Sequence, residues 1–162
     1  MVMASTRPRG PRFGACFVAV SNVTHPTLRD YEGMHPTPDL ETIVRDLDRH
    51  VAVDGWEQPP RLFALVTEDG PMSVVEQPWQ SNGADLLADL AAIEWPDEVV
   101  GAAVSVQRVL ENEADVRVTV GALRDQTVAT ALRYRAHDTD DSVAVSSGVV
   151  PRLERALWDT LQ

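Results

Sequence analysis

The stretch VRVTVGALRDQTVATALRYR, residues 116–135, decides the class of fold. Apolar residues alternate with Arg, Thr and Gly over residues 116–122, and a second alternation runs over residues 127–135. A period of two is typical of a strand that buries one face. Because only the residues LRDQ, 123–126, separate the two runs, we expect the strands to be antiparallel neighbours. The sequence therefore predicts a hairpin that projects Arg133 and Arg135 from an exposed face.

Further upstream, the segment DGWEQPP, residues 54–60, joins a helix to a strand. Gly55 suits the left-handed residue that ends a helix, and the paired prolines prevent the helix from continuing. Trp56 lies where a hydrophobic residue commonly folds back on the last helical turn, so we expect it in the core. The helix itself has an apolar stripe at helical spacing, with Thr37 as its cap and Pro38 at its first position.

The remaining elements follow from the same patterns. Alternation and turn residues predict strands, and apolar residues at helical spacing predict helices. A polar loop, HDTDDS, leads to a last helix for which Ser147 is the expected cap. We expect strands over residues 61–67, 72–76 and 99–110, a turn over 68–71, and helices over 86–93 and 150–161.

The resulting order is helix, strand, strand, helix, three strands, helix. Because hairpin-length connections make the sheet antiparallel, we predict an α+β domain with a five-stranded antiparallel sheet flanked by three helices. This order of elements resembles that of roadblock-type, profilin-like domains. The resemblance implies the spatial strand order 2-1-5-4-3, with one helix on one face of the sheet and two on the other.

Four segments carry a resemblance to a known family: GWEQPPRLFALV, IEWPDEVVGAAVSV, VRVTVGALRD and ALRYRAHDTDD. In this order they resemble a family of small acidic actinobacterial proteins of unknown function, over roughly residues 38–162. The resemblance implies a cytoplasmic or unassigned location and no established catalytic residue. One departure is the loop Glu111–Asp115, which is shorter than the resemblance leads us to expect.

The first residues of the chain differ from the rest. Residues 1–12 carry three Arg and no acid, and the apolar run FGACFVAV follows them. We expect residues 1–35 to be a disordered tail or a gene-model extension upstream of Met34, and residues 36–162 to form a single domain. A third alternative is a signal peptide that ends near Ser21, although its apolar core would be short and interrupted by a glycine.

The charge balance excludes two classes of partner. A net charge of −11 argues against a nucleic-acid backbone, which needs a basic face, and against anionic membranes. No apolar run in the sequence approaches the ~18–20 residues that cross a bilayer. All 14 basic residues are Arg, which suggests a GC-rich bacterial genome. The single cysteine, Cys16, allows no internal disulfide, so we expect a cytoplasmic protein.

No familiar catalytic motif is present, because the sequence lacks a phosphate-binding loop, a G-x-S-x-G elbow and an H-E-x-x-H zinc motif. The strongest polar candidate is RYRAHDTDDS, residues 133–142. Its Arg133 and Arg135 can bind a carboxylate or a phosphate. An EF-hand is excluded, because Val stands where the loop needs Gly and Glu. The candidate ligands of a looser metal site are His137, Asp138 and Asp140. The ordinary alternative is a solvated turn whose Arg side chains pair with acidic neighbours.

Trp79, in the polar stretch QPWQSNG, is the interface candidate, because exposed aromatic side chains anchor protein partners. Packing against the neighbouring hairpin is its ordinary alternative. Without a catalytic motif, we expect a non-catalytic module with no cofactor that binds a protein partner or forms a homodimer. The alternative function is a small-ligand or divalent-metal-binding domain, in one form hydrolytic, centred on residues 133–141.

Overall fold

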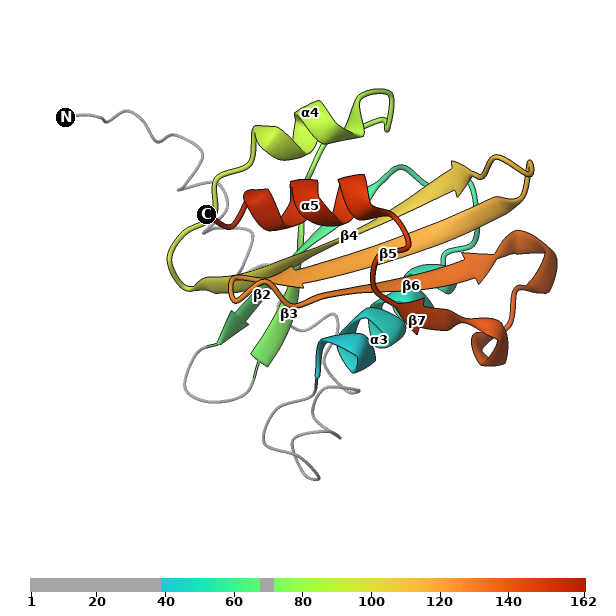
Figure 1. Cartoon of the computed structure of the whole chain (residues 1–162), viewed down its shortest axis with the longest axis horizontal. Helices are drawn as coiled ribbons and strands as arrows, with labels where there is room; N and C mark the ends of the chain where they lie inside the picture. Colours follow the sequence, from blue (N-terminus) through green and yellow to red (C-terminus); the bar gives the residue numbers. More distant parts are fainter. Residues whose placement is uncertain (1–38, 68–71) are drawn as a thin grey trace.

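An antiparallel sheet with helices on both faces forms the part of the chain that the computed structural model describes, residues 39–67 and 72–162 (Figure 1). The expectations for residues 1–35, for Cys16 and for the turn over residues 68–71 lie outside these ranges. The elements are α3 (Leu40–Ala52), β2 (Arg61–Thr67), β3 (Met72–Gln77), α4 (Leu86–Ala91), β4 (Val99–Val109), β5 (Asp115–Leu123), β6 (Val128–Tyr134), the short 3-10 turns η1 (Arg135–His137) and η2 (Asp140–Ser142), β7 (Ala144–Ser146) and α5 (Pro151–Asp159).

The sheet has six strands in the order β3-β2-β4-β5-β6-β7, and every neighbouring pair is antiparallel. The hairpin predicted over residues 116–135 is confirmed as β5 and β6. The predicted five-stranded order 2-1-5-4-3 is wrong, because β2 pairs with β4 rather than with β6 and because the chain adds β7. The connection through α4 carries the chain from β3 to the other side of β2, so β3 and β4 flank that strand. The strand order thus differs from the roadblock-type order.

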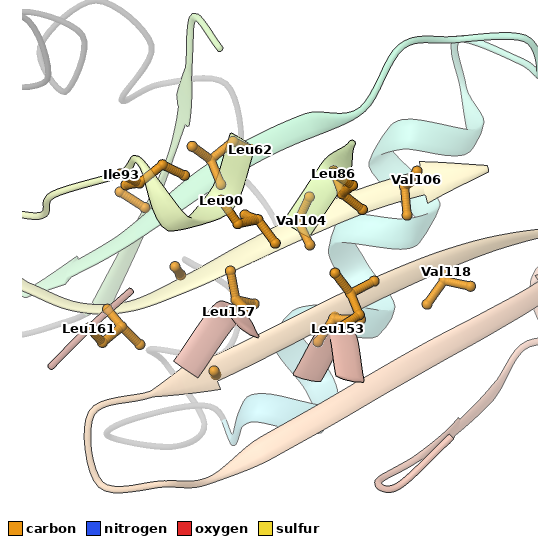
Figure 2. Close-up of a cluster of buried hydrophobic side chains, with 14 of the residues drawn as sticks. Leu62, Leu86, Leu90, Ile93, Val104, Val106, Val118, Leu153, Leu157 and Leu161 are labelled. Atoms are coloured by element: carbon orange, nitrogen blue, oxygen red, sulfur yellow. The ribbon is translucent and has the colours of Figure 1, made fainter. Parts of the chain in front are cut away.

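Helix α3 covers one face of the sheet, and helices α4 and α5 cover the other. Under α4 and α5, the buried side chains of Leu86, Leu90, Leu153 and Leu157 pack against the strands (Figure 2). A second group of buried apolar residues lies under α3, around Phe63. The α+β class and the three flanking helices are therefore as the sequence predicts.

Both faces of the β5–β6 hairpin are buried, which corrects the prediction of an exposed face that carries Arg. Arg117 and Arg133 lie opposite each other on the two strands, and each residue is only 3% exposed. The reason is that α3 packs on this face and places the side chain of Asp48 against Arg133. Arg135 lies just beyond the strand, in the exposed turn η1.

The start and end of α3 have clear local causes. Asp39 is its cap, and the Oδ1 of Asp39 accepts a hydrogen bond from the amide of Thr42 at 2.8 Å. The cap predicted at Thr37 and the first helical position predicted at Pro38 lie outside the described residues. After the helix, Gly55 has a φ of +83°, the left-handed conformation that the sequence predicts for it.

Helix α5 begins at Pro151 without a side-chain hydrogen bond at its cap, so the prediction of a Ser147 cap is wrong. The buried carboxylate of Glu154 instead accepts hydrogen bonds from the amide of Gly148 at 3.0 Å and from the hydroxyl of Thr130 at 2.6 Å. A helical Glu that reaches back to the preceding loop satisfies a backbone donor there, so no Ser is needed. None of the helices within the described ranges is long and apolar enough to cross a membrane.

Candidate functional site

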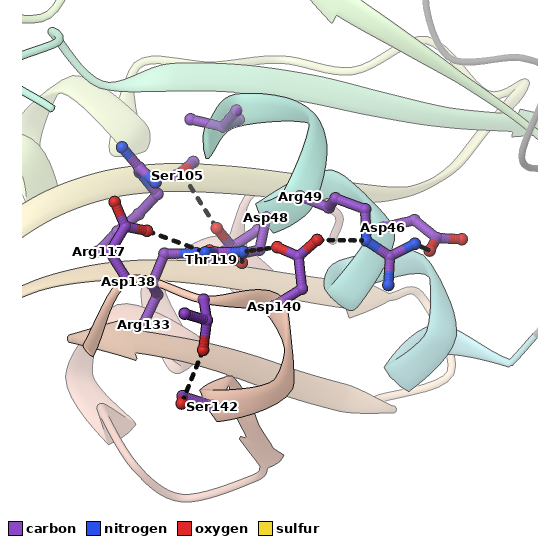
Figure 3. A network of polar contacts seen from close by, with 12 residues as sticks. Asp46, Asp48, Arg49, Ser105, Arg117, Thr119, Arg133, Asp138, Asp140 and Ser142 are labelled. Atoms are coloured by element: carbon purple, nitrogen blue, oxygen red, sulfur yellow. Dashed lines mark hydrogen bonds and ion pairs between the residues drawn. The ribbon is translucent and has the colours of Figure 1, made fainter. Parts of the chain in front are cut away.

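Three of the five residues predicted for a ligand or metal site, Arg133, Asp138 and Asp140, lie in a charged cluster between the end of β6 and the second half of α3 (Figure 3). Arg133 is at its centre, with its guanidinium 2.7 Å from the carboxylate of Asp48, 2.9 Å from that of Asp138 and 2.6 Å from that of Asp140. Arg49 adds a contact of 3.3 Å to Asp140. The structure thus brings together three of the predicted residues and adds Asp48, which the sequence did not suggest.

Asp48 is the most deeply buried member of this cluster. Its side chain is 0% exposed, and its Oδ1 has no hydrogen-bond partner among the described residues. Burial raises the pKa of Asp48, while the hydrogen bond and the charge of Arg133 oppose this rise. Burial lowers the pKa of Arg133, but the carboxylates of Asp48 and Asp140 outweigh burial and leave that pKa above its ordinary value. The carboxylates therefore compensate for the burial of Arg133, whereas Arg133 offsets the burial of Asp48 only in part, and the pKa of Asp48 stays above its ordinary value.

Trp56 connects the cluster to a second buried Arg. The guanidinium carbon of Arg117 lies 4.4 Å from the centre of the Trp56 ring, and the indole Nε1 donates a hydrogen bond to Asp138 at 2.9 Å. Arg117 also donates to the carbonyl of Gly55, whereas its Nη1 is buried without a partner among the described residues. Burial lowers the pKa of Arg117. Trp56 is therefore half-buried against a cation, rather than a core residue as the sequence predicts.

Little space remains beside Arg117. The cavity next to its side chain measures about 10 Å³, which is room for about one water molecule. Pockets that bind small molecules typically measure about 300–1,000 Å³. The buried Arg side chains therefore serve the packing of α3 on the sheet in this conformation, and they leave no room for a ligand beside Arg117.

Arg135 and His137 lie outside the buried cluster, in the exposed turn η1. Arg135 pairs with Glu57 at 2.7 Å and with Asp115 at 3.4 Å. In the part of the chain that the structure describes, no group of three or more His, Cys, Asp or Glu side chains is arranged to hold a metal ion. The two aspartates after β6 already face a guanidinium, whose positive charge repels a cation. This geometry gives the metal alternative no support.

Because of Asp138, the contribution of this cluster to the stability of the protein depends on pH. Its hydrogen bonds with Trp56 and Arg133 hold the pKa of Asp138 below its ordinary value. Such a carboxylate stabilises the folded state above its unfolded pKa, about 3.9, and loses this contribution as the pH falls through the lower folded value. Asp138→Asn should therefore lower the free energy of unfolding at pH 7, and its difference from the parent should shrink below about pH 4. Denaturant unfolding at a series of pH values measures this difference.

The neighbouring exposed residue Asp141 provides the matched control. We expect Asp141→Asn to stay within about 0.5 kcal/mol of the parent at each pH, as is usual for surface substitutions. A deficit of Asp138→Asn that remained constant from pH 7 to pH 3 would contradict the assigned cause.

Two pockets that share Leu87 lie on the opposite face of the sheet, between α4 and α5, and we call them together the groove. Its larger part has a volume of about 670 Å³ and is lined by apolar residues, among them Leu87 and Trp95, and by polar and charged residues, among them Asp97, Arg124 and Asp159. A smaller part, of about 300 Å³, lies on the other side of Leu87, next to Val150. Both volumes lie within the range of binding clefts, unlike the cavity beside the buried Arg. None of the residues predicted for a site lines this groove.

More than half of the chain matches a known protein family. The model of the PPA1309-like protein family matches residues 40–115 and 109–162. The chain belongs to the PPA1309-like family. No curated protein and no solved structure matches it. Because the description of the PPA1309-like family contains no activity, the match confirms the predicted membership of a family of unknown function.

In this PPA1309-like chain, three features escaped the sequence-based prediction: Asp48, the burial of Arg117, and the groove. Asp48 follows Val44 by four residues and so falls on the apolar stripe of α3, which is a signal that the sequence does contain. The groove has no such signal, because its walls come from distant parts of the chain. Trp79 does not line the groove but packs, half-buried, against the core under α4 and α5, so its role as an interface anchor stays a prediction.

Proposed function

We propose that this PPA1309-like protein is a non-catalytic interaction module that binds a protein partner through the groove between α4 and α5. The contrast between the two faces of the sheet carries the proposal. On the α3 face, ion pairs engage the charged residues around Arg133. On the opposite face, apolar side chains such as Leu87 and Trp95 line an open groove together with polar and charged ones. Protein interfaces combine apolar and aromatic groups with polar ones, as the lining of this groove does.

Arg124 supports the shape of this groove. Its Nε donates to the carbonyl of Val99 at 2.7 Å, and its other nitrogens donate to the carbonyls of Pro96 and Leu161. These contacts join the segment that leads into β4 to the end of α5, which are two walls of the larger part of the groove. A groove that is held open before binding limits the entropy lost when a partner docks.

The alternative function, a ligand or metal site over residues 133–141, receives less support. It would require Asp138 or Asp140 to leave Arg133, whose side chain is buried. Removing carboxylates from a buried guanidinium is unfavourable, because its charge is then less well compensated. We therefore place binding on the groove rather than on this segment.

Photo-cross-linking in the host cell tests the proposal on the full chain. A photo-reactive amino acid at the exposed Ala88 of α4 should give a specific cross-link to a protein partner, either a second copy or an unlike chain. Ala91→Glu puts a charge in the groove lining at an exposed position and should abolish the cross-link. Ala136→Glu makes the same change in the exposed turn η1, outside the groove, and should leave the cross-link intact.

The outcome depends on the comparison between the two variants rather than on capture alone. A cross-link that persists in Ala91→Glu, or one that both variants abolish, would count against the groove as the binding surface. A chain that gives no specific cross-link from α4 would overturn the proposed function. Circular dichroism of both variants checks that each one remains folded.

A further inference from the structure

Charge is sorted along the groove between α4 and α5. Three acidic residues, Glu94, Asp97 and Asp159, line its larger part, at the end of α5. Arg124 also lines this part, with its guanidinium bound to backbone carbonyls, so the net charge of the lining is negative. The basic residues Arg108 and Arg152 line its smaller part, beside the start of α5. Leu87 lines both parts and lies between them. The groove therefore carries net negative charge at one end and positive charge at the other, with apolar residues along both parts.

The two charges on α5 are placed against the dipole of the helix. Arg152 lies in the first turn and Asp159 is the last helical residue, whereas first turns favour acids and last turns favour bases, each by about 0.3–1 kcal/mol. Arg155 pairs with Asp159 at 3.0 Å, but an exposed pair at this spacing contributes only about 0.3–0.5 kcal/mol. An arrangement that the isolated helix does not favour points to a role outside the single chain.

We infer that the partner is a second copy of this chain, whose α4–α5 face packs on the same face of the first about a two-fold axis. This inference rests on the proposed function and names its partner. The axis runs across the helices, so that the two α5 helices are antiparallel and groove faces groove. Each end of one groove then meets the oppositely charged end of the other, and each contact occurs twice.

The spacing along α5 fits this arrangement. Arg152 and Asp159 are seven residues apart, which is about two turns or ~10.5 Å along one side of the helix. Ala156 lies between them and lines the groove. An antiparallel copy therefore sets each Arg152 opposite Asp159 of the second copy. The small side chain of Ala156 then lies near the axis, where it lets the helices approach closely.

A second copy fits better than an unlike partner. An unlike partner would have to carry acidic, apolar and basic groups in the reverse order, whereas a copy turned about the axis presents them by symmetry. The net charge of −11 opposes association at long range, but exposed charges are screened beyond ~8 Å at physiological ionic strength. The apolar centre around Leu87 and Ala91 adds burial that does not depend on charge.

Sedimentation equilibrium of the full chain at ~0.15 M salt tests the inference. We expect a reversible dimer whose dissociation constant rises about tenfold or more in Arg152→Glu and in Asp159→Arg, because each reversal sets like charges together at two symmetric places. The combined variant Arg152→Glu/Asp159→Arg should restore the dimer. Arg45→Glu, at an exposed position on α3, makes the same change in net charge as Arg152→Glu and should leave the dissociation constant unchanged.

The stability of the variants shows whether a weaker dimer reflects a lost contact between copies or a loss of folding, and the helix dipole predicts that stability. Arg152→Glu improves the placement of charge on α5, whereas Asp159→Arg gains at the helix end but loses the pair with Arg155 and sets two Arg side chains together. Arg152→Glu should therefore unfold at the temperature of the parent or above it, when the chains are compared at a concentration at which the parent is monomeric. A single reversal that weakens the dimer while the fold keeps its stability assigns the effect to the contact between copies.

The experiments give different results if this inference fails and if the proposed function fails. A chain that is monomeric at every concentration, or a dimer that neither reversal weakens, overturns the second copy as the partner. If the cross-link from Ala88 then reaches an unlike protein and is lost in Ala91→Glu, the interaction module stands with another partner. If the cross-link does not depend on Ala91, both proposals fall.

Discussion

Replacing Arg133 with methionine is expected to lower the free energy of unfolding at pH 7 by about 3–5 kcal/mol. Arg133 is the hydrogen-bonding partner of Asp48, a buried carboxylate whose other oxygen already lacks a partner among the described residues. Because methionine fills a volume similar to that of arginine, the loss comes mainly from the unpaired charge rather than from a cavity. Urea denaturation of the parent and of Arg133→Met at the same pH measures the difference.

The deficit of Arg133→Met should also depend on pH. In the parent, burial raises the pKa of Asp48 and Arg133 opposes this rise, so removal of Arg133 raises the pKa further. The folded state then binds a proton more tightly than the unfolded chain does, and its stability falls as the pH rises above about 3.9. The deficit should therefore be smaller at pH 4.5 than at pH 7. An equal deficit at the two pH values would argue against the buried carboxylate as its cause.

A double-mutant cycle that combines Arg133→Met with Asp48→Ala measures the interaction free energy between Asp48 and Arg133. Asp48→Ala alone leaves Arg133 with the carboxylates of Asp138 and Asp140, so it should destabilise the protein less than Arg133→Met does. The double variant Asp48→Ala/Arg133→Met removes the unpaired buried charge and should be more stable than Arg133→Met alone. If the two single effects simply add, the buried pair does not account for the loss.

The strands and helices could be predicted from the sequence more readily than the order of the strands. The β5–β6 hairpin is a local feature, because alternation and a short turn define both strands and their direction. The pairing of β2 with β4 is not local, since β3 and α4 come between them. Alternation indicates which residues share a face, but it does not indicate which strand lies alongside. The strand β7 has three residues, too few to show a period.

The charged cluster could be predicted in part for the same reason. Arg133, Asp138 and Asp140 lie close together along the chain, so their proximity is local. Their burial depends on α3, a distant segment that places Asp48 on this face of the sheet. An Arg that alternates with Val, as Arg117 does, has the same pattern on a solvated face as on a face that a helix covers. Sequence periodicity therefore predicts which residues share a face of the strand, but it does not predict whether a helix covers that face.

The close approach of α3 to the sheet depends on a glycine, and Gly121→Ala should lower the free energy of unfolding by about 1–3 kcal/mol. A Cβ at Gly121 would lie 2.7 Å from Cγ1 of Val44 and 3.0 Å from Cδ1 of Leu40. The end of the Leu40 side chain can rotate away, but a helical valine is held in one χ1 rotamer. The helix must then move away from β5, which also loosens the contact between Asp48 and Arg133, one turn further along α3. Denaturant unfolding measures the loss.

A double-mutant cycle with Val44→Ala tests whether this contact is the cause. Val44 is buried, so Val44→Ala alone removes two buried methyl groups and should cost on the order of 2 kcal/mol. In the Gly121→Ala background it also removes the obstructing methyl group, so the double variant should be more stable than the sum of the single effects by about 1 kcal/mol. Val51→Ala makes the same change about two turns along α3, and its effect should add to that of Gly121→Ala within about 0.5 kcal/mol. If the effects of Val44→Ala and Gly121→Ala also add, the strain lies elsewhere. The contact between α3 and β5 is then not the reason for a glycine at position 121.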